Sequence, residues 1–290
     1  MTDRQTRVLL ALPAVAWLAL LMIVPCVILL VNSFFERGVY GGIDYVLTFE
    51  NYARAFDPLF LGIFLSSVRI AATAGIVAVL IAYPAAYAIS RAAPERQPAY
   101  LFLVMLPFWT NYLVRTYAWI VMLNSKGPVV GAVTSVGLPE PPLLYNEFAV
   151  VVGLVYNYLP FVVLAIFSAL GRVNKEVLEA SADLGATGLD TFRRVLLPLT
   201  VPGIATGFVF VFVLSIGNFV TPALLGGKRV QMIGTLVYDQ FLSARDWPFG
   251  SALAAVLIGV MLLLLYLQAL VSRRIETGAE RAATVAPGHA

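Results

Sequence analysis

Six long apolar runs dominate the sequence and restrict the fold more than any other feature. They cover approximately residues 8–31, 63–90, 99–123, 148–170, 200–222 and 251–272, and none contains Asp or Glu. A hydrocarbon core about 30 Å thick is crossed by roughly 20 apolar residues of helix. Helices satisfy their own backbone hydrogen bonds in lipid. The sequence therefore predicts an all-α membrane protein with six transmembrane helices.

Composition supports this class and excludes others. Of the 290 residues, 60% are apolar or aromatic and only 12% are charged, whereas about 25% are charged in ordinary soluble domains. The single histidine is His289 and the single cysteine is Cys26. Zinc hydrolysis and His-dependent nucleophilic catalysis need side chains that the spans lack. We therefore expect a protein that is not an enzyme, with no catalytic residues and no metal site.

The distribution of Lys and Arg predicts the orientation. Eleven of the 19 basic residues lie in loops on the side that includes both termini, six lie on the other side, and two lie within spans. By the positive-inside rule, both termini are cytoplasmic. The two within spans are Arg69 and Arg115. Both are expected to extend to the outer headgroups, although Arg115 could instead pair with an acid of a neighbouring subunit.

Small residues recur at four-residue spacing in several spans. Ala74, Ala78, Ala82 and Ala86 form one such ridge, and Gly203 and Gly207 form a GxxxG pair. Ridges of this kind let helix backbones approach closely in a membrane. We expect these surfaces to pack within the bundle.

The connection at residues 171–199 is polar but has helical periodicity. A first short amphipathic helix is expected to stop at Gly185, because a helix C-terminus often needs a residue that tolerates positive φ. A second short helix is expected to end at Pro198. The pattern alone fits either a docking element or a helix lying on the lipid headgroups.

Residue spacing in this connection carries a family resemblance. Glu179-Ala180-Ser181 is followed after three residues by Gly185, and then after nine residues by Val195 and by Leu197-Pro198. This pattern resembles the EAA loop of permease subunits of binding-protein-dependent ABC importers, with Ser181 and Val195 in place of Ala and Ile. The resemblance implies a helix that docks in a groove of the ATP-binding subunit. The residues implied to couple to that ATPase are Glu179, Ala180, Ser181, Asp183, Leu184, Gly185 and Pro198.

Other segments narrow the resemblance. MLPFWTNYLVRTYAWIVML, LVYNYLPFVVL, NFVTPALLGG and RDWPFGSA resemble the B-type permease of spermidine/putrescine importers. This implies half of a translocation path for a polyamine. Importers of an aminophosphonate, an amino acid derivative or a sugar stay open as alternatives. A secondary transporter is less favoured, because it would usually carry an ionisable coupling residue in a span.

Aromatic and amide side chains within the spans are the candidates for that path. Polar groups at membrane depth generally face a bundle interior or a water-filled cavity, and each aromatic face attracts an alkylammonium by about 0.5–2 kcal/mol. Aromatics near span ends also fit an ordinary interfacial belt. Because the spans hold no acid, carboxylates would have to come from a partner or from Asp239 and Asp246. The candidate path residues are Trp109, Asn111, Tyr112, Tyr156, Asn157, Tyr158 and Asn218.

Energy is expected to come from another chain. The sole Gly-Lys pair, Gly227-Lys228, lacks the rest of a phosphate-binding loop, so this chain should bind no cofactor, with ATP and Mg²⁺ held by the partner ATPase. The resemblance implies a multi-pass protein of the bacterial inner membrane. Its implied partners are a second homologous permease forming a heterodimer, a dimer of cytoplasmic ATP-binding subunits, a periplasmic solute-binding protein and the lipid bilayer, without nucleic acid.

The expected organisation is one transmembrane permease domain over residues 1–290. Within it we expect a five-helix permease core at residues 62–272, the cytoplasmic EAA coupling loop at residues 171–199 and a flexible cytoplasmic tail at residues 273–290.

Overall fold

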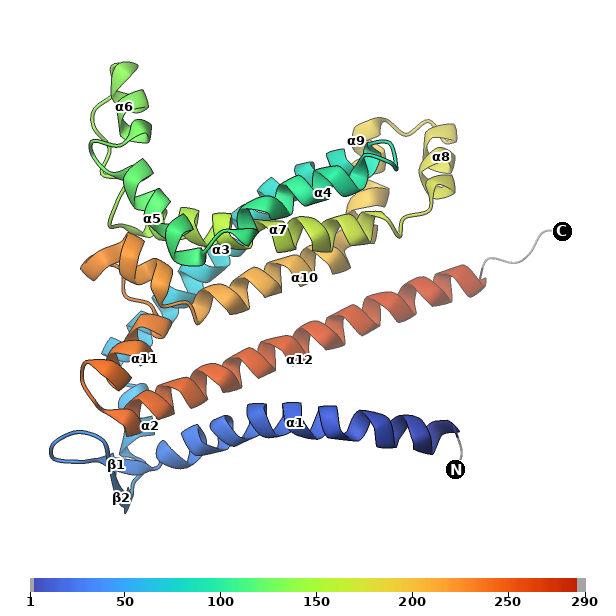
Figure 1. The fold of residues 1–290 in the computed structure, drawn as a ribbon. Coiled ribbons are helices and arrows are strands. Elements are labelled where there is room, and N and C mark those ends of the chain that lie inside the picture. The colour runs from blue at the N-terminus through green and yellow to red at the C-terminus, as the bar shows by residue number, and fades with distance from the viewer. Residues whose placement is uncertain (1–2, 286–290) are drawn as a thin grey trace. The chain divides into compact units, whose positions relative to one another are not determined.

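A computed structural model describes the backbone of residues 3–285 and the side chains of residues 12–270. The described chain is mostly helical, as the composition predicts (Figure 1). It divides into two compact units, one formed by residues 1–62 and 236–260 and the other by residues 63–235 and 261–290. Within the described residues, five helices are long and apolar enough to cross a membrane. These lie at Leu12–Asn32, Pro58–Arg91, Glu147–Leu170, Gly188–Ile216 and Trp247–Leu270.

The third apolar run is not one helix. It forms α4 (Gln97–Met105), the 3-10 turn η1 (Leu106–Trp109) and α5 (Tyr112–Leu123). Thr110 is extended, with ψ 153°, and the Asn111 side chain accepts a hydrogen bond from the backbone N–H of Leu113. Pro107 cannot donate a backbone hydrogen bond, and Asn111 caps the helix that follows. The prediction of a continuous helix over 99–123 is therefore wrong.

The first unit contains α1 (Asp3–Asn32), a two-stranded antiparallel sheet and α2 (Glu50–Ala55). Strands β1 (Phe35–Arg37) and β2 (Ile43–Leu47) pair Arg37 with Ile43, with a bulge between Phe35 and Glu36. The Asn51 amide donates to the carbonyl oxygens of Ser33 (3.1 Å) and Phe35 (2.8 Å). Most of α11 (Ile233–Leu242) and the start of α12 (Trp247–Val285) complete the unit.

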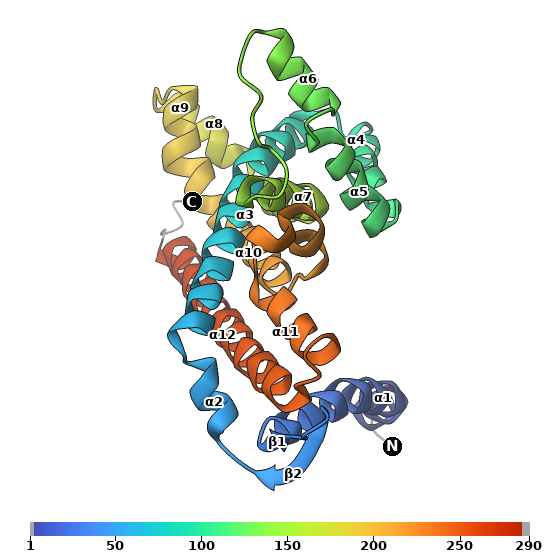
Figure 2. The same ribbon diagram turned by 90° about the vertical axis from the view of Figure 1, so that its left-hand side faces the viewer.

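The second unit is built around α3 (Pro58–Arg91), α7 (Glu147–Leu170) and α10 (Leu197–Ile216). Helices α7 and α10 lie side by side (Figures 1 and 2). A Cβ atom added to Gly203 would lie 2.3 Å from the Ala169 Cβ, and one added to Gly207 would lie 2.8 Å from Val162 Cγ1. The glycine pair thus lets the two backbones approach, as the spacing predicts.

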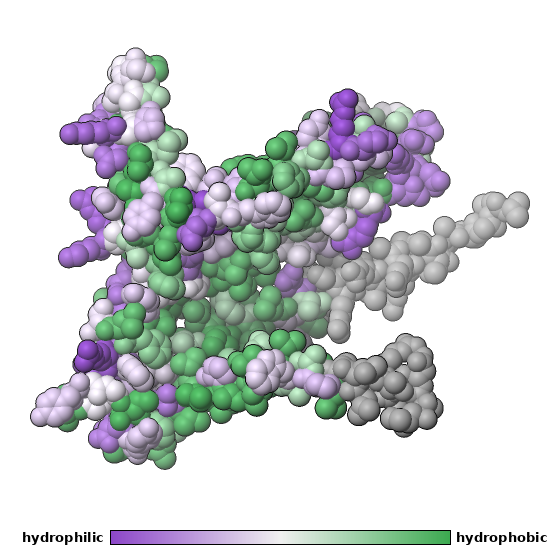
Figure 3. All heavy atoms as spheres, viewed as in Figure 1, coloured by the Kyte–Doolittle hydropathy of each residue, from purple (hydrophilic) through white to green (hydrophobic). Residues whose placement is uncertain are grey.

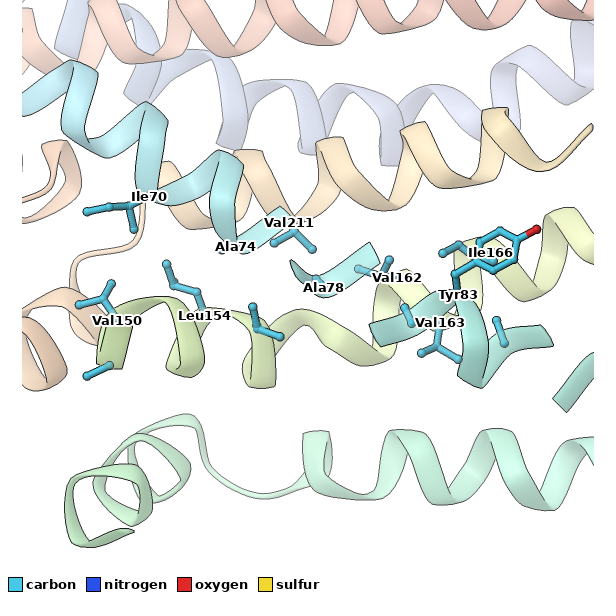
Figure 4. Close-up of a cluster of buried hydrophobic side chains, with 14 of the residues drawn as sticks. Ile70, Ala74, Ala78, Tyr83, Val150, Leu154, Val162, Val163, Ile166 and Val211 are labelled. Carbon is cyan, nitrogen blue, oxygen red and sulfur yellow. The ribbon is translucent and has the colours of Figure 1, made fainter. Parts of the chain in front are cut away.

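The predicted alanine ridge of α3 is also buried. Ala74, Ala78, Ala82 and Ala86 each have 0% of their surface exposed. They belong to a cluster that includes Leu154, shown with its neighbours in Figure 4. Small side chains on α3 therefore meet larger aliphatic ones in the core of this unit.

Shorter elements fill the connections of the second unit. Helix α6 (Pro128–Ser135) follows α5, and two consecutive turns, η3 (Pro222–Gly226, a π-helix) and η4 (Gly227–Arg229, a 3-10 helix), follow α10. Since α10 ends at Ile216 with Gly217 as its C-cap, the predicted span over 200–222 is interrupted at residues 217–219, and helical backbone resumes at residue 220.

The polar connection before α10 contains α8 (Lys175–Asp183), α9 (Gly188–Thr191) and the π-helical turn η2 (Phe192–Leu196). The second predicted short helix does not end at Pro198, because η2 leads directly into α10. Pro198 lies in the first turn of α10, where a missing N–H is tolerated. Hydrophilic residues gather over α8 and α9, whereas mostly apolar residues cover α1 from Leu12 onward (Figure 3).

Helix α12 extends beyond the predicted sixth span. Its backbone is helical to Val285, so the tail predicted for 273–290 is helical through that residue. Residues 286–290 lie outside the described part of the chain.

Candidate functional site

The connection between α7 and α10 begins with a capped helix. The Asn174 side chain accepts a hydrogen bond from the backbone N–H of Glu176 (3.1 Å), and its amide donates to the Glu176 carboxylate (3.0 Å). This is an N-cap, which satisfies backbone groups that a helix start leaves free. Asn174 thereby sets where the first helix of this connection begins.

Gly185 follows the C-cap of α8, Leu184, and has the positive φ that its sequence position predicts. Its φ is +81° and its N–H donates to the carbonyl of Ala182 (2.9 Å). The Ala186 N–H donates to the carbonyl of Ser181 (3.1 Å). A residue with a Cβ is disfavoured at positive φ, so glycine allows the chain to reverse here.

Side-chain hydrogen bonds connect the two short helices. The hydroxyls of Ser181 on α8 and Thr191 on α9 are 3.0 Å apart. The Thr187 hydroxyl accepts from the Asp190 N–H (3.2 Å) and donates to the Asp190 carboxylate (2.6 Å). These contacts give the loop a defined shape of its own.

The tip of this loop has few partners within the chain. Leu184 is 89% exposed, and Glu179, Ala180, Asp183 and Gly185 are all exposed. Among the described residues, the Glu179 carboxylate makes no hydrogen bond or ion pair. The tip of the loop is therefore accessible to another protein.

Three of the predicted path residues meet in one polar cluster. The Asn218 amide donates to the hydroxyls of Tyr112 (2.6 Å) and Tyr158 (2.8 Å). Its carbonyl oxygen accepts from the Thr221 N–H (2.9 Å), and the hydroxyls of Tyr112 and Thr221 share a hydrogen bond. The cluster therefore links α5, α7 and the segment after α10. Thr221 was not predicted, although its i,i+3 relation to Asn218 was visible in NFVTP.

Arg115 is buried beside this cluster. It is only 6% exposed, and its guanidinium carbon lies 5.4 Å from the centre of the Phe108 ring and 5.8 Å from that of Tyr112. Its Nε and Nη1 atoms have no hydrogen-bond partner in the described chain. The expectation that Arg115 extends to the headgroups is wrong, because the turn at Phe108 and the first turn of α5 enclose its side chain.

The remaining predicted path residues lie apart from the cluster. Trp109 is 72% exposed, and Asn111 is exposed at the start of α5. Tyr156 packs edge-on against Trp119, with ring centres 5.5 Å apart. Asn157 is 1% exposed and neither of its amide atoms has a partner. Three consecutive helical residues point in directions about 100° apart, so Tyr156, Asn157 and Tyr158 cannot line one surface.

Asp246 is not available as a free carboxylate. It is 2% exposed, forms an ion pair with Arg54 (3.2 Å) and accepts a hydrogen bond from the Phe249 N–H (3.2 Å). The Arg54 guanidinium also lies 4.0 Å from the centre of the Phe249 ring. This carboxylate holds the start of α12 in place within its unit.

No group of three or more His, Cys, Asp or Glu side chains that could bind a metal occurs among the described residues.

Comparison with known proteins identifies the family. Residues 78–277 match the model of the binding-protein-dependent transport system inner membrane component family. The chain is 38% identical over 267 residues to the spermidine/putrescine transport system permease protein PotB of Haemophilus influenzae, covering 90% of this chain and 93% of the relative. It is 25% identical over 252 residues to PotC of the same organism, covering 87% and 91% of the two chains.

A solved structure has the same fold. A chain of a bacterial alginate ABC transporter, crystallised with its alginate-bound periplasmic protein, aligns with a TM-score of 0.76 at 19% identity, covering 94% of this chain and 95% of that one. The protein belongs to the family of binding-protein-dependent transport system inner membrane components. It is thus a multi-pass permease of the inner membrane, which confirms the family predicted from the EAA-like loop.

Proposed function

We propose that this permease forms half of the translocation path of an ATP-driven importer of polyamines such as spermidine or putrescine. The observation that carries the substrate class is the 38% identity to a spermidine/putrescine permease over 90% of the chain. The importer of another small solute, such as an aminophosphonate, an amino acid derivative or a sugar, is the second candidate. The alginate transporter supports that alternative in fold only, because its identity is 19%.

The chemistry of the polar cluster is compatible with a weakly bound cation. Tyr112 and Tyr158 offer aromatic faces, and the phenol and amide oxygens of the cluster can accept hydrogen bonds. No carboxylate lies in the cluster among the described residues, so a polyamine would be held there without an ion pair. Weak sites favour passage, because a tight site would retain the substrate. The remaining candidate residues would contribute to the path only in other conformations of the transporter or at the ends of the path. These are Trp109, Asn111, Tyr156 and Asn157.

Coupling to ATP hydrolysis is proposed for the loop at residues 171–199. The exposed tip carrying Glu179, Leu184 and Gly185 would dock on a cytoplasmic ATPase, with Glu179 pairing with a basic group. Closure of two ATPase subunits would push the loop and, through α7 and α10, open the bundle toward the periplasm. Alternating access of this kind needs no cofactor on this chain, and ATP and Mg²⁺ would remain on the ATPase.

The proposed topology keeps six crossings and two cytoplasmic termini. The broken segment α4–η1–α5 would supply the third crossing, because its residues 97–123 are together long enough to span the hydrocarbon core. Residues 62–272 would form the five-helix core. The region after residue 272 would then lie in the cytoplasm.

The proposed assembly contains a second, homologous permease. The similarity to both PotB and PotC of one organism supports a heterodimer of related permeases. A dimer of ATP-binding subunits and a periplasmic solute-binding protein complete it, in keeping with the family description.

Uptake by proteoliposomes that contain the complete importer tests this function. With ATP inside and the cognate binding protein outside, labelled spermidine or putrescine should accumulate, and excess unlabelled polyamine should block it. If only a sugar or an anionic solute competes with the labelled substrate, the polyamine assignment is rejected, but the assignment as an importer stands. ATP-independent uptake would reject the importer itself.

A further inference from the structure

An apolar groove runs along the second unit, separate from the polar cluster. It has a volume of about 590 Å³ and is lined by α3, α5 and α7. Val77 and Ile81 form one wall, and Val151, Val155 and Leu159 form the other. Trp119 and Tyr156, which pack edge-on, also line it. Tyr156 thus faces this groove, although the sequence suggested a place in the translocation path.

Two opposite charges stand at one end of the groove. Arg69 on α3 and Glu147 at the start of α7 form an ion pair and both line the groove. Their side chains are 65% and 49% exposed, so the pair leaves most of the Arg69 donors and one carboxylate oxygen accessible. The other end of the groove has only apolar walls.

The length of the groove matches one leaflet of a bilayer. From Arg69 to Ile81 on α3, and from Glu147 to Leu159 on α7, the lining advances by twelve residues, which corresponds to about 18 Å of helix at 1.5 Å per residue. Half of a hydrocarbon core about 30 Å thick is about 15 Å. A groove anchored by charges at the headgroup level thus reaches approximately the middle of the membrane.

We propose that this groove binds one acyl chain of a phospholipid whose headgroup carries a phosphate and a primary ammonium. The phosphate would bind free N–H groups of Arg69, and the ammonium would bind the free oxygen of Glu147. Charges of both signs at the mouth match a zwitterionic headgroup better than an anionic one, because a headgroup such as that of phosphatidylglycerol has no ammonium to pair with Glu147.

This site is independent of the transported solute. In the proposed topology it would lie in the periplasmic leaflet and contact both α3 and α7. Lipid bound there would fill a space that otherwise lacks contacts along two helices of the permease core.

Native mass spectrometry of the purified importer tests the proposal. After equilibration with equal amounts of phosphatidylethanolamine and phosphatidylglycerol, the wild-type permease should retain at least threefold more of the former. Thr73→Trp, which fills the groove, should lower retained phosphatidylethanolamine at least fivefold. The matched control is Ile76→Trp, at a position that is 53% exposed on the same helix and outside the groove lining.

A conservative variant keeps the test valid if Thr73→Trp fails to fold. Glu147→Gln retains shape but should abolish the preference for phosphatidylethanolamine. Equal retention of both lipids by the wild type, or unchanged retention in Thr73→Trp, would overturn the proposal. Efficient photo-cross-linking of a thiol-attached benzophenone at Thr73→Cys, in a Cys26→Ser background, to the partner permease would overturn it too, because the groove would then hold a protein helix.

Discussion

The α7–α10 helix pair and the loop that joins it differ in nearly every physical respect. The pair is close-packed: Gly203 and Gly207 meet Ala169 and Val162 with no room for another methyl group. The loop at residues 171–199 is held by caps and a few hydroxyl contacts, and its tip at Leu184 is 89% exposed. Because the helix pair is rigid and the exposed loop is held by its own hydrogen bonds, a displacement of the loop by a docked partner can move the pair without repacking the interface between α7 and α10. Mutations should therefore separate the two regions: changes in the loop should affect coupling, and changes in the pair should affect stability.

The largest effect on transport is expected from Glu179→Lys. Reversal of this exposed charge should lower uptake by proteoliposomes at least about 100-fold, because it would oppose the basic group that the ATPase is proposed to offer. Thermal stability and membrane insertion should not change, since Glu179 has no partner within the described chain. Glu95→Lys makes the same charge change at an exposed position between α3 and α4 and serves as the control. Normal uptake by Glu179→Lys would remove the basis for a docking role.

In the helix pair, Gly203→Ala should produce the largest loss of stability. The new Cβ would lie 2.3 Å from the Ala169 Cβ and 3.0 Å from the Ala165 carbonyl oxygen. Overpacking of this kind costs about 1–3 kcal/mol. The thermal midpoint of the purified complex should fall by several degrees. Gly217→Ala, where nothing lies within 4 Å of the added atom, should leave the midpoint unchanged. Equal midpoints for the two variants would contradict close packing of α7 and α10.

Substitutions in the polar cluster of Tyr112, Tyr158 and Asn218 should have moderate effects on both transport and stability. Asn218→Leu removes two donated hydrogen bonds and one accepted one. We expect a loss of about 1–3 kcal/mol in stability, because the two tyrosine hydroxyls lose a partner, and a roughly tenfold drop in uptake. Asn157→Leu is the matched control, since this amide is buried without a partner. A similar loss of stability in both variants would mean that Asn157 has a partner in the assembled transporter.

Among the substitutions of buried residues, Arg115→Met is expected to cost the least stability. Arg115 is 6% exposed, and within the described chain its guanidinium packs against the rings of Phe108 and Tyr112. Replacing a buried charge that lacks a counterion with an apolar side chain of similar length is often neutral or stabilising. The thermal midpoint of the complete importer should stay constant or rise. A fall of several degrees would indicate that a neighbouring subunit supplies a carboxylate to Arg115.

Local signals in the sequence predicted the features that depend on only a few neighbouring residues. Apolar length predicted five long helices, and positive φ at Gly185 was predicted from its place after an amphipathic helix. The small-residue ridges were predicted from four-residue spacing, which a helix converts directly into one face. The EAA-like spacing predicted the family that the comparisons then showed.

Longer-range features were not predicted, because they depend on how separate segments meet. The break at Thr110 and Asn111 interrupts a run whose composition is uniformly apolar on either side. Pro107 and Asn111 were visible as a possible helix stop and start, but prolines elsewhere in the spans, such as Pro160, lie inside continuous helix. The outcome depends on whether neighbouring groups satisfy the freed backbone.

The sequence by itself determined the class of the protein, its apolar helices and the loop that marks its family, since each follows from composition or fixed spacing. Only the tertiary structure decided which polar residues meet. It grouped Tyr112, Tyr158 and Asn218, placed Tyr156 in a separate groove and buried Arg115 against two rings. The physical reason is that helical periodicity sets the direction of each side chain, whereas the neighbour it reaches depends on the packing of helices that are remote in sequence.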